Sequence, residues 1–298
     1  NARGALGEIF DIGKRFGRNA QWGIRVSAEN IQGKTAVERE KMTTRDFYIN
    51  LDHQGAKSTT NLFAGYRYSK NEGGQRYFAF DGAGANAYTG DRLPAPPSGR
   101  SNYSFNGAHL TMTTWTAVLN HEQRLSERWK AFLNAGSSYN HGRSYVMTNA
   151  SRVFMLNEDG DFQNALWTNP FAVRNNYVQL GVRGAFDIGP VRNDMILALD
   201  RDWYYGYWGY EQNGRYGNQV PVYGRVSGSL RDGIRTLVQN YDPATISGPI
   251  KSGATIYSGI SVTDTLTYGK ASVLLGVHHH SVKATSYSNT SGYKDGKP

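Results

Sequence analysis

The stretch Tyr177-Val178-Gln179-Leu180-Gly181-Val182-Arg183-Gly184-Ala185-Phe186-Asp187-Ile188 decides the fold, because apolar residues recur at every second position. Val178, Leu180, Val182, Phe186 and Ile188 share one face, and polar or small residues occupy the other. A period of two over this length predicts a β-strand with one apolar face. Gly189-Pro190 interrupts the strand, Asn193 is expected to complete a short turn, and a second alternating run begins at Met195.

This hairpin has the dimensions of a membrane-crossing hairpin. A strand of about 12 residues is roughly twice the usual globular length and is close to the 9–11 residues that a tilted strand needs to cross a bilayer. The second strand ends in the aromatic run from Trp203 to Tyr210. Aromatic residues at strand ends are typical of the membrane–water interface. The hairpin therefore predicts a transmembrane β-barrel.

The rest of the chain repeats this pattern. The alternation predicts about ten long strands in five hairpins. Short turns within the hairpins alternate with long loops at about 72–107, 147–175 and 211–255. Such alternation is typical of bacterial barrels, with short periplasmic turns and long extracellular loops. We therefore expect an all-β, antiparallel, up-and-down transmembrane β-barrel, present here as an incomplete arc. Two residues do not fit the outward apolar faces: Arg201, which implies a bulge, a snorkelling position or a different register, and Asp264, which is expected at the periplasmic rim.

The composition excludes several classes of protein. No apolar run approaches the roughly 18 residues of a spanning helix, and the absence of Cys excludes thiol catalysis and disulfides. The formal net charge of +9 suits solvated loops, or attraction of lipopolysaccharide phosphates or an anionic ligand. Nucleic acid is not expected as a partner, because the chain has no run of five or more Lys and Arg residues.

Several segments resemble the β-barrel part of TonB-dependent outer-membrane receptors, most closely the siderophore-receptor branch. They occur in the order of that family and cover nearly the whole chain: Asp11-Ile12-Gly13-Lys14-Arg15-Phe16-Gly17, Trp22-Gly23-Ile24-Arg25-Val26, Arg92-Leu93-Pro94-Ala95-Pro96-Pro97, Asn102-Tyr103-Ser104, Gly181 to Val191, Leu237-Val238-Gln239-Asn240-Tyr241-Asp242-Pro243, Asp264-Thr265-Leu266-Thr267 and Leu275-Gly276-Val277-His278. The sequence departs from the family pattern at His278, where Arg is usual, and near Asn193, where His is common.

The resemblance implies a 22-stranded barrel of the plugged outer-membrane transporter type. Residues 1–298 would then form part of the barrel domain, and the family's plug domain and C-terminal strands would lie outside this sequence. The sequence starts without a signal peptide and ends without an aromatic closing strand, so we expect an interior piece of a longer protein. The implied location is the bacterial outer membrane. The implied partners are a ferric siderophore or similar metal chelate, outer-membrane lipid and lipopolysaccharide, and the inner-membrane TonB complex, reached through the missing N-terminal part.

Two clusters in the expected extracellular loops combine aromatic rings with cations, which suits an anionic metal chelate. The first consists of Arg76, Tyr77, Phe78, Phe80, Tyr88 and Arg92; the second, beside Trp203, consists of Tyr205, Tyr207, Trp208, Tyr210, Arg215 and Tyr216. The alternative is that the aromatic residues from Trp203 to Tyr210 only form the interfacial girdle. His278-His279-His280 is expected to supply polar lumen residues, because His278 and His280 share a face without a nearby carboxylate in the sequence. No metal ligand or cofactor is expected.

Three functions remain open from the sequence. The first is active uptake of a ferric siderophore by a TonB-dependent receptor, although cobalamin, haem or a sugar is also possible as the cargo. The second is a passive porin or substrate-specific channel, and the third is a structural or adhesive barrel. An enzyme is not expected, because His121, His141, Ser137 and Asp187 occur without a motif such as Gly-x-Ser-x-Gly.

Overall fold

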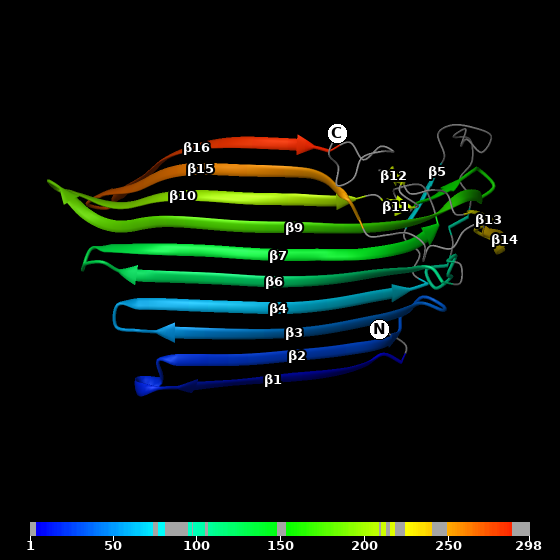
Figure 1. Ribbon diagram of the computed structural model, residues 1–298, viewed down its shortest axis with the longest axis horizontal. Coiled ribbons are helices and arrows are strands. Elements are labelled where there is room, and N and C mark those ends of the chain that lie inside the picture. The colour runs from blue at the N-terminus through cyan, green and yellow to red at the C-terminus, as the bar shows by residue number, and fades with distance from the viewer. Residues whose placement is uncertain are drawn as a thin grey trace.

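A single long antiparallel sheet dominates the structure, a computed structural model (Figure 1). The strands follow chain order in the sheet, β1-β2-β3-β4-β6-β7-β9-β10-β15-β16. The structure describes residues 4–73, 77–80, 95–96, 98–104, 107–147, 153–208, 210–212, 215–217, 224–239 and 249–287. The strand bounds are β1 (Leu6–Phe16), β2 (Trp22–Lys34), β3 (Lys41–Gln54), β4 (Ser58–Glu72), β6 (His109–Arg124), β7 (Trp129–Met147), β9 (Asp161–Ile188), β10 (Val191–Trp208), β15 (Lys251–Tyr268) and β16 (Ala271–Ser286).

Short and long connections are separated at opposite ends of the sheet (Figure 1). The turns β1–β2, β3–β4, β6–β7, β9–β10 and β15–β16 lie at the left end in Figure 1, and the first of them contains the 3-10 turn η1 (Arg18–Ala20). The strand ends that the longer connections join lie at the right end. The predicted up-and-down meander with asymmetric connections is therefore confirmed. Among the described residues, no helix is long and apolar enough to cross a membrane.

The register divides each strand into two faces. In one lateral row Ala131, Val182, Leu197, Val262 and Val277 are direct partners on five adjacent strands. The neighbouring row on the opposite face contains Lys130, Arg183, Ile196, Thr263 and Gly276. We call the apolar face the outer face and the polar face the inner face. Large apolar side chains on the outer face stay exposed in the isolated chain, for example Leu180 at 52% and Leu199 at 53%, as expected for a surface that contacts lipid.

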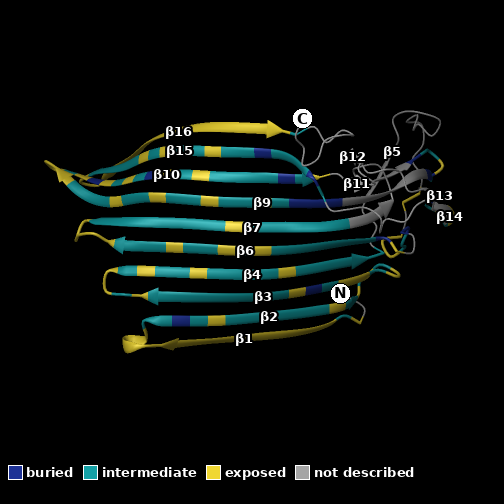
Figure 2. Cartoon of the chain, viewed as in Figure 1, coloured by how far each residue is buried: buried dark blue, intermediate teal, exposed yellow. Residues whose placement is uncertain are grey.

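The sheet has two open edges. Within the described residues β1 pairs only with β2, and β16 pairs only with β15. Both edge strands are exposed along their whole length (Figure 2). The ten strands are thus an unclosed arc, as the sequence predicts.

The predicted turn at Asn193 is wrong, because β10 already begins at Val191. The turn has only two residues, Gly189 and Pro190, and Gly189 has φ 58°. A two-residue turn of this kind needs a positive φ at its first position, which Gly supplies without strain. Asn193 lies inside the strand, 3% exposed, and its side chain donates to the carbonyl oxygens of Phe186 and Val191.

The predicted loops contain more strand than expected. They contain the short strands β5 (Tyr77–Phe80), β8 (Val153–Leu156), β11 (Tyr210–Gln212), β12 (Arg215–Gly217), β13 (Gly224–Ser229) and β14 (Gly233–Gln239). β9 itself starts at Asp161, where the sequence predicts a loop to about residue 175, and its first residues pair with β13. Thr236-Leu237-Val238, within the loop predicted at about 211–255, belongs to β14.

Several of the least exposed residues lie at the end with the long connections. Leu156 and Phe162 are 3% and 2% exposed, and Tyr103 is 5% exposed. The Tyr103 hydroxyl donates to the carbonyl oxygen of Leu230 at 2.7 Å, and the Leu230 amide donates to that of Gly160 at 2.9 Å. These contacts hold the β13–β14 hairpin against the turn before β9, so part of the long connections is an ordered layer at this rim.

Candidate functional site

The inner face carries one polar row across the whole sheet. Its members are direct lateral partners: Arg15, Gly23, Asp52, Asn61, Asn120, Asn134, Gln179, Asp200, Gly259 and His280. Asn134 donates to Gln179 at 3.0 Å, and Arg15 pairs with Asp52 at 2.8 Å. Amides and ion pairs that satisfy one another across strands can line a hydrated bore without an apolar partner.

Six basic side chains of the inner face have carboxylate partners on the same face. Besides Arg15 and Asp52, the pairs are Arg25 with Asp11 at 2.5 Å, Arg67 with Asp46 at 3.5 Å, Arg192 with Asp194 at 3.0 Å, and both Lys130 and Arg183 with Glu122. Charge on this face is therefore nearly balanced locally. The inner wall can hold a polar or charged partner by exchange of hydrogen bonds and not by a strong net field.

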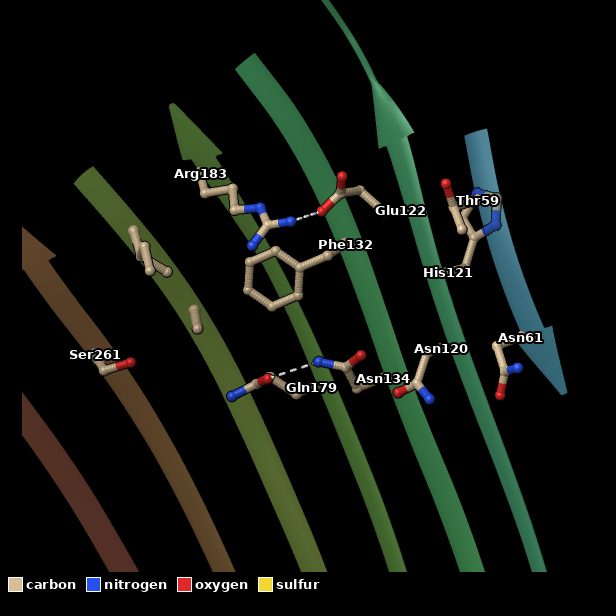
Figure 3. Close-up of a pocket in the computed structure, with 12 residues that line it drawn as sticks. Thr59, Asn61, Asn120, His121, Glu122, Phe132, Asn134, Gln179, Arg183 and Ser261 are labelled. Atoms are coloured by element: carbon tan, nitrogen blue, oxygen red, sulfur yellow. Dashed lines mark hydrogen bonds and ion pairs between the residues drawn. The ribbon is translucent and has the colours of Figure 1, made fainter. Parts of the chain in front are cut away.

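A hollow of about 660 Å³ lies over the centre of the inner face (Figure 3). Phe132 lies between the Arg183–Glu122 ion pair and the Asn134–Gln179 hydrogen bond, and Asn61 and Asn120 extend the polar wall toward β4. Gly181 leaves room for the Phe132 ring, because a Cβ at this position would overlap the ring. The hollow is lined mainly by polar side chains and by the aromatic ring of Phe132. Such a lining suits a bulky polar ligand or a contact with another domain.

Aromatic residues occupy the inner face nearer the long connections. Tyr177, Asp202 and Tyr257 form one lateral row on β9, β10 and β15. Both tyrosines are accessible, 36% and 45% exposed. Further along, Phe171 stacks on Trp208 with ring centroids 5.6 Å apart. Trp208 is 40% exposed. These residues offer ring faces and phenol hydroxyls toward the bore.

The structure divides the second predicted ligand cluster between the two faces. Tyr205 and Tyr207 continue the outer series of Leu197 and Leu199, whereas Trp208 lies on the inner face. Tyr210, Arg215 and Tyr216 belong to the separate hairpin of β11 and β12. The outer placement of Tyr205 and Tyr207 favours the interfacial girdle for these two residues. The ligand role of Trp208 remains a prediction.

Half of the first predicted cluster lies outside the described residues. This holds for Arg76, Tyr88 and Arg92. Tyr77, Phe78 and Phe80 form β5, which pairs in parallel with β8. Their proposed contact with a chelate stays a prediction.

The inner tyrosines Tyr177 and Tyr257 are absent from the predicted ligand residues. The parity of the alternation, which places Gln179 and Asp187 inward, would have identified Tyr177. Tyr257 has the same parity as Ser261, which lines the hollow. The signal for both tyrosines is thus the inner parity of their strands and not an aromatic cluster in a loop.

His278 and His280 lie on the inner face, as predicted from their spacing. Their rings are 5.5 Å apart, and the His278 Nε2 is 3.8 Å from an Asp200 carboxylate oxygen. That carboxylate is near in space although none is near in sequence. Among the described residues, no group of three His, Asp or Glu side chains is arranged to hold a metal ion.

Known proteins share this architecture. BauA, the ferric preacinetobactin receptor from Acinetobacter baumannii, superimposes with a TM-score of 0.75 and 21% identity over 95% of this chain and 40% of its own. FpvA of P. aeruginosa, solved with bound pyoverdines, superimposes with a TM-score of 0.70 and 14% identity over 96% of this chain and 37% of its own. The chain has the barrel fold of the outer-membrane siderophore receptors.

The sequence comparison agrees with the fold. The ferrichrome receptor FcuA of Yersinia enterocolitica is 23% identical over 286 residues, which make up 95% of this chain. The chain spans 35% of the length of that relative. No family model matches the sequence. FcuA, BauA and FpvA, which this chain resembles, are receptors and not enzymes.

Proposed function

We propose that this chain forms part of the barrel of a TonB-dependent outer-membrane receptor that takes up a ferric siderophore actively. Residues 1–298 would supply ten of the barrel strands, with a plug domain and further strands in the remainder of the protein. Support comes from the likeness to receptor chains of which this chain covers 35–40%. The proposed location is the bacterial outer membrane, where the outer face contacts lipid and the plug engages the inner-membrane TonB complex.

One observation carries this proposal. The sequence aligns with a ferrichrome receptor along 95% of the chain, and the aligned chain folds into long two-faced strands whose long connections share one end. A two-faced sheet alone suits any outer-membrane barrel, including a passive porin. The alignment over the whole sheet favours a receptor over a porin.

The inner wall suggests how a chelate is held. A siderophore brings its iron already coordinated, so the wall needs ring faces and hydrogen bonds and no metal ligands. Tyr177, Tyr257 and Trp208 provide these on the side of the long connections, from which an extracellular ligand would enter. The chain would act by binding and passage, without catalysis.

Uptake of ⁵⁵Fe-siderophores by iron-starved cells tests the proposed function. Deletion of the gene should abolish saturable uptake of at least one ferric siderophore, and a protonophore should have the same effect on the wild type. Energy-independent uptake proportional to concentration, with ion conductance by the purified protein, would instead establish a passive channel.

Paired variants test the proposed wall. Tyr177→Ala with Tyr257→Ala should weaken chelate binding by about tenfold or more, because a stacked ring contributes on the order of 1 kcal/mol. Tyr205→Ala with Tyr207→Ala is the matched control, since it removes two tyrosines from the outer face toward the same end of the sheet. Equal losses in both pairs would count against the inner wall as the binding surface.

A further inference from the structure

Asp200 and Asp202 lie on the inner face of β10, because the register of this strand is regular around them. The pairing of β10 with β9 and β15 is continuous from Asn193 to Gly206, and its register shifts only between Gly206 and Tyr207. The bulge and the register error considered for Arg201 from the sequence are therefore excluded. The Arg201 guanidinium carbon lies 5.2 Å from the centre of the Trp203 ring on the outer face, as in a snorkelling arginine. The cation nearest in sequence to the two carboxylates is thus on the other side of the sheet.

Asp202 has neither a hydrogen bond nor an ion pair with any described residue, in contrast to the carboxylates of the inner ion pairs. Asp200 has one charged neighbour, since the His278 Nε2 is 3.8 Å from its carboxylate. Both side chains lean over Gly259, where a Cβ would come within 2.5 Å of that nitrogen. Asp202, two residues further along the strand, is left facing the bore without a counter-ion.

The inner wall around Asp202 contains no Lys or Arg. This holds for the inner positions among residues 134–142 of β7, 171–179 of β9, 200–208 of β10, 253–259 of β15 and 278–286 of β16. The ionisable side chains at these positions are Tyr177, Asp200, Asp202, Tyr204, Tyr257, His278 and His280. With neutral histidines this part of the wall is negative, so it attracts cations and repels an anionic chelate. The sign is opposite to that expected from the loop arginines.

Two tyrosine rings flank the Asp202 carboxylate. Tyr177 on β9 and Tyr257 on β15 are its direct lateral partners, and they are 36% and 45% exposed. Side chains at such positions start about 5 Å apart at Cβ, so a group that contacts Asp202 is within reach of both rings. Ring faces attract a cation within about 6 Å of their centres, and a carboxylate forms a charge-assisted hydrogen bond with an ammonium group. The three side chains therefore fit a positively charged group better than a carboxylate or a catecholate.

We infer that Asp202, between Tyr177 and Tyr257, binds a positively charged group of the ferric chelate, such as a primary ammonium, and selects cationic over anionic chelates. This inference rests on the proposed function and specifies the charge of its cargo. The site lies between the long connections and the hollow over the centre of the inner face, so an entering chelate meets it before the hollow.

A charge series built on one chelate tests this inference. The probe is a linear ferric trihydroxamate with a free terminal amine, compared with the same compound after acetylation or succinylation of the amine. The iron centre is unchanged, and the arm becomes positive, neutral or negative. The complete protein in detergent should bind the amine form about tenfold more tightly than the acetylated form, because an exposed cation–π contact and an exposed ion pair together contribute about this much. The succinylated form should bind most weakly. Quenching of tryptophan fluorescence gives the dissociation constants.

Variants of Asp202 assign the preference to this carboxylate. Asp202→Asn should reduce the tenfold preference to about threefold or less, since only the tyrosine rings remain. Asp202→Glu should keep the preference, and Asp202→Lys should favour the succinylated form. The matched control is Asp194→Asn, which removes a carboxylate from the inner face of the same strand near the short turns, where Arg192 pairs with it at 3.0 Å; it should keep the wild-type preference.

Heat-modifiable migration on gels verifies that each variant is folded, and the wild-type order of affinities tests the sign of the site even if a variant does not fold. Tighter binding of the succinylated form, or no saturable binding of the amine form, would overturn the inference. So would an equal preference in the wild type and Asp202→Asn, which would show that a cation elsewhere in the receptor neutralises Asp202. Energy-dependent ⁵⁵Fe uptake of the neutral or anionic form would in those cases leave the proposed function intact, whereas passive uptake of every form would refute it.

Discussion

A charge placed on one face of β15 should cost far more than the same charge on the other face. Val262 lies on the outer face between its partners Leu197 and Val277, and it is 40% exposed in the isolated chain. Ser261, the preceding residue, lies on the inner face and lines the hollow. The substitutions Val262→Arg and Ser261→Arg therefore differ by one position in the chain and by the medium that the new side chain enters.

The height of Val262 sets the expected magnitude. It lies about six residues from Tyr268, the end of β15, and a tilted strand rises about 2.5 Å per residue along the barrel axis. Val262 is thus about 15 Å from the short-turn rim, near the middle of the hydrocarbon layer. An arginine at that depth destabilises a barrel by about 2–4 kcal/mol, whereas Ser261→Arg, in a wet bore, should cost less than about 1 kcal/mol.

Equilibrium unfolding of the complete protein in lipid vesicles, followed by tryptophan fluorescence against guanidinium, measures both variants. The difference of about 2 kcal/mol or more corresponds to a factor of about 30 in the unfolding equilibrium constant. Equal destabilisation by the two variants, or a larger effect of Ser261→Arg, would refute the assignment of the faces.

Three other outcomes are expected. Gly181→Val should lower the free energy of unfolding by about 1–3 kcal/mol, because a Cβ at this position would overlap the Phe132 ring. Gly136→Ala should be tolerated, since only the Ala117 carbonyl oxygen is near, at 3.7 Å. Chemical unfolding measures the stability of both variants. A hydrogen bond from Arg235 lowers the pKa of Asp232 in the β13–β14 turn, so this contact is stabilising above the unfolded pKa of about 4 and is lost as the pH falls through the lower folded pKa. NMR titration should give Asp232 a higher pKa in the Arg235→Gln variant than in the wild type. An unchanged pKa would contradict the assignment. Residues 1–298 expressed alone in lipid should not form a stable, heat-modifiable monomer, because the free edges of β1 and β16 would leave unpaired backbone groups in hydrocarbon at several kcal/mol each.

The strand ends at the short turns are predictable from the sequence, because alternation stops there and a turn residue follows. Tyr268-Gly269-Lys270-Ala271 illustrates this: alternation stops at Tyr268, where β15 ends, and β16 begins at Ala271 after the two turn residues. Side-chain direction follows as well, since Val178, Leu197 and Val262 all lie on the predicted outer face.

The strand ends at the long connections are not predictable in the same way. Pro170 and the polar residues around it indicate a loop, yet they lie within β9. Pro170 is just beyond the last β9–β10 pair, Phe171 with Trp208, so β9 is paired only with β7 at this point and tolerates a residue without an N–H group. Beyond the membrane both faces of a strand are wet, and alternation no longer marks it.

The candidate site shows the same limit. The sequence locates aromatic clusters, but only the parity carried from Leu197 and Leu199 shows that Tyr205 is outer and Trp208 is inner. The partners on neighbouring strands, such as Asp202 between Tyr177 and Tyr257, depend on register across hairpins. Single-strand patterns contain no information on how far one hairpin is shifted against the next.

Charge is what makes that register unique in the second half of the sheet. A shift of β10 by one residue would turn Asp194, Asp200 and Asp202 toward hydrocarbon and would bring Leu197 and Leu199 into the bore. Moving three carboxylates into lipid would cost several kcal/mol, more than any gain for Arg201, which already reaches the interface from its outer position. The acidic residues inside and the arginine outside therefore select the same register.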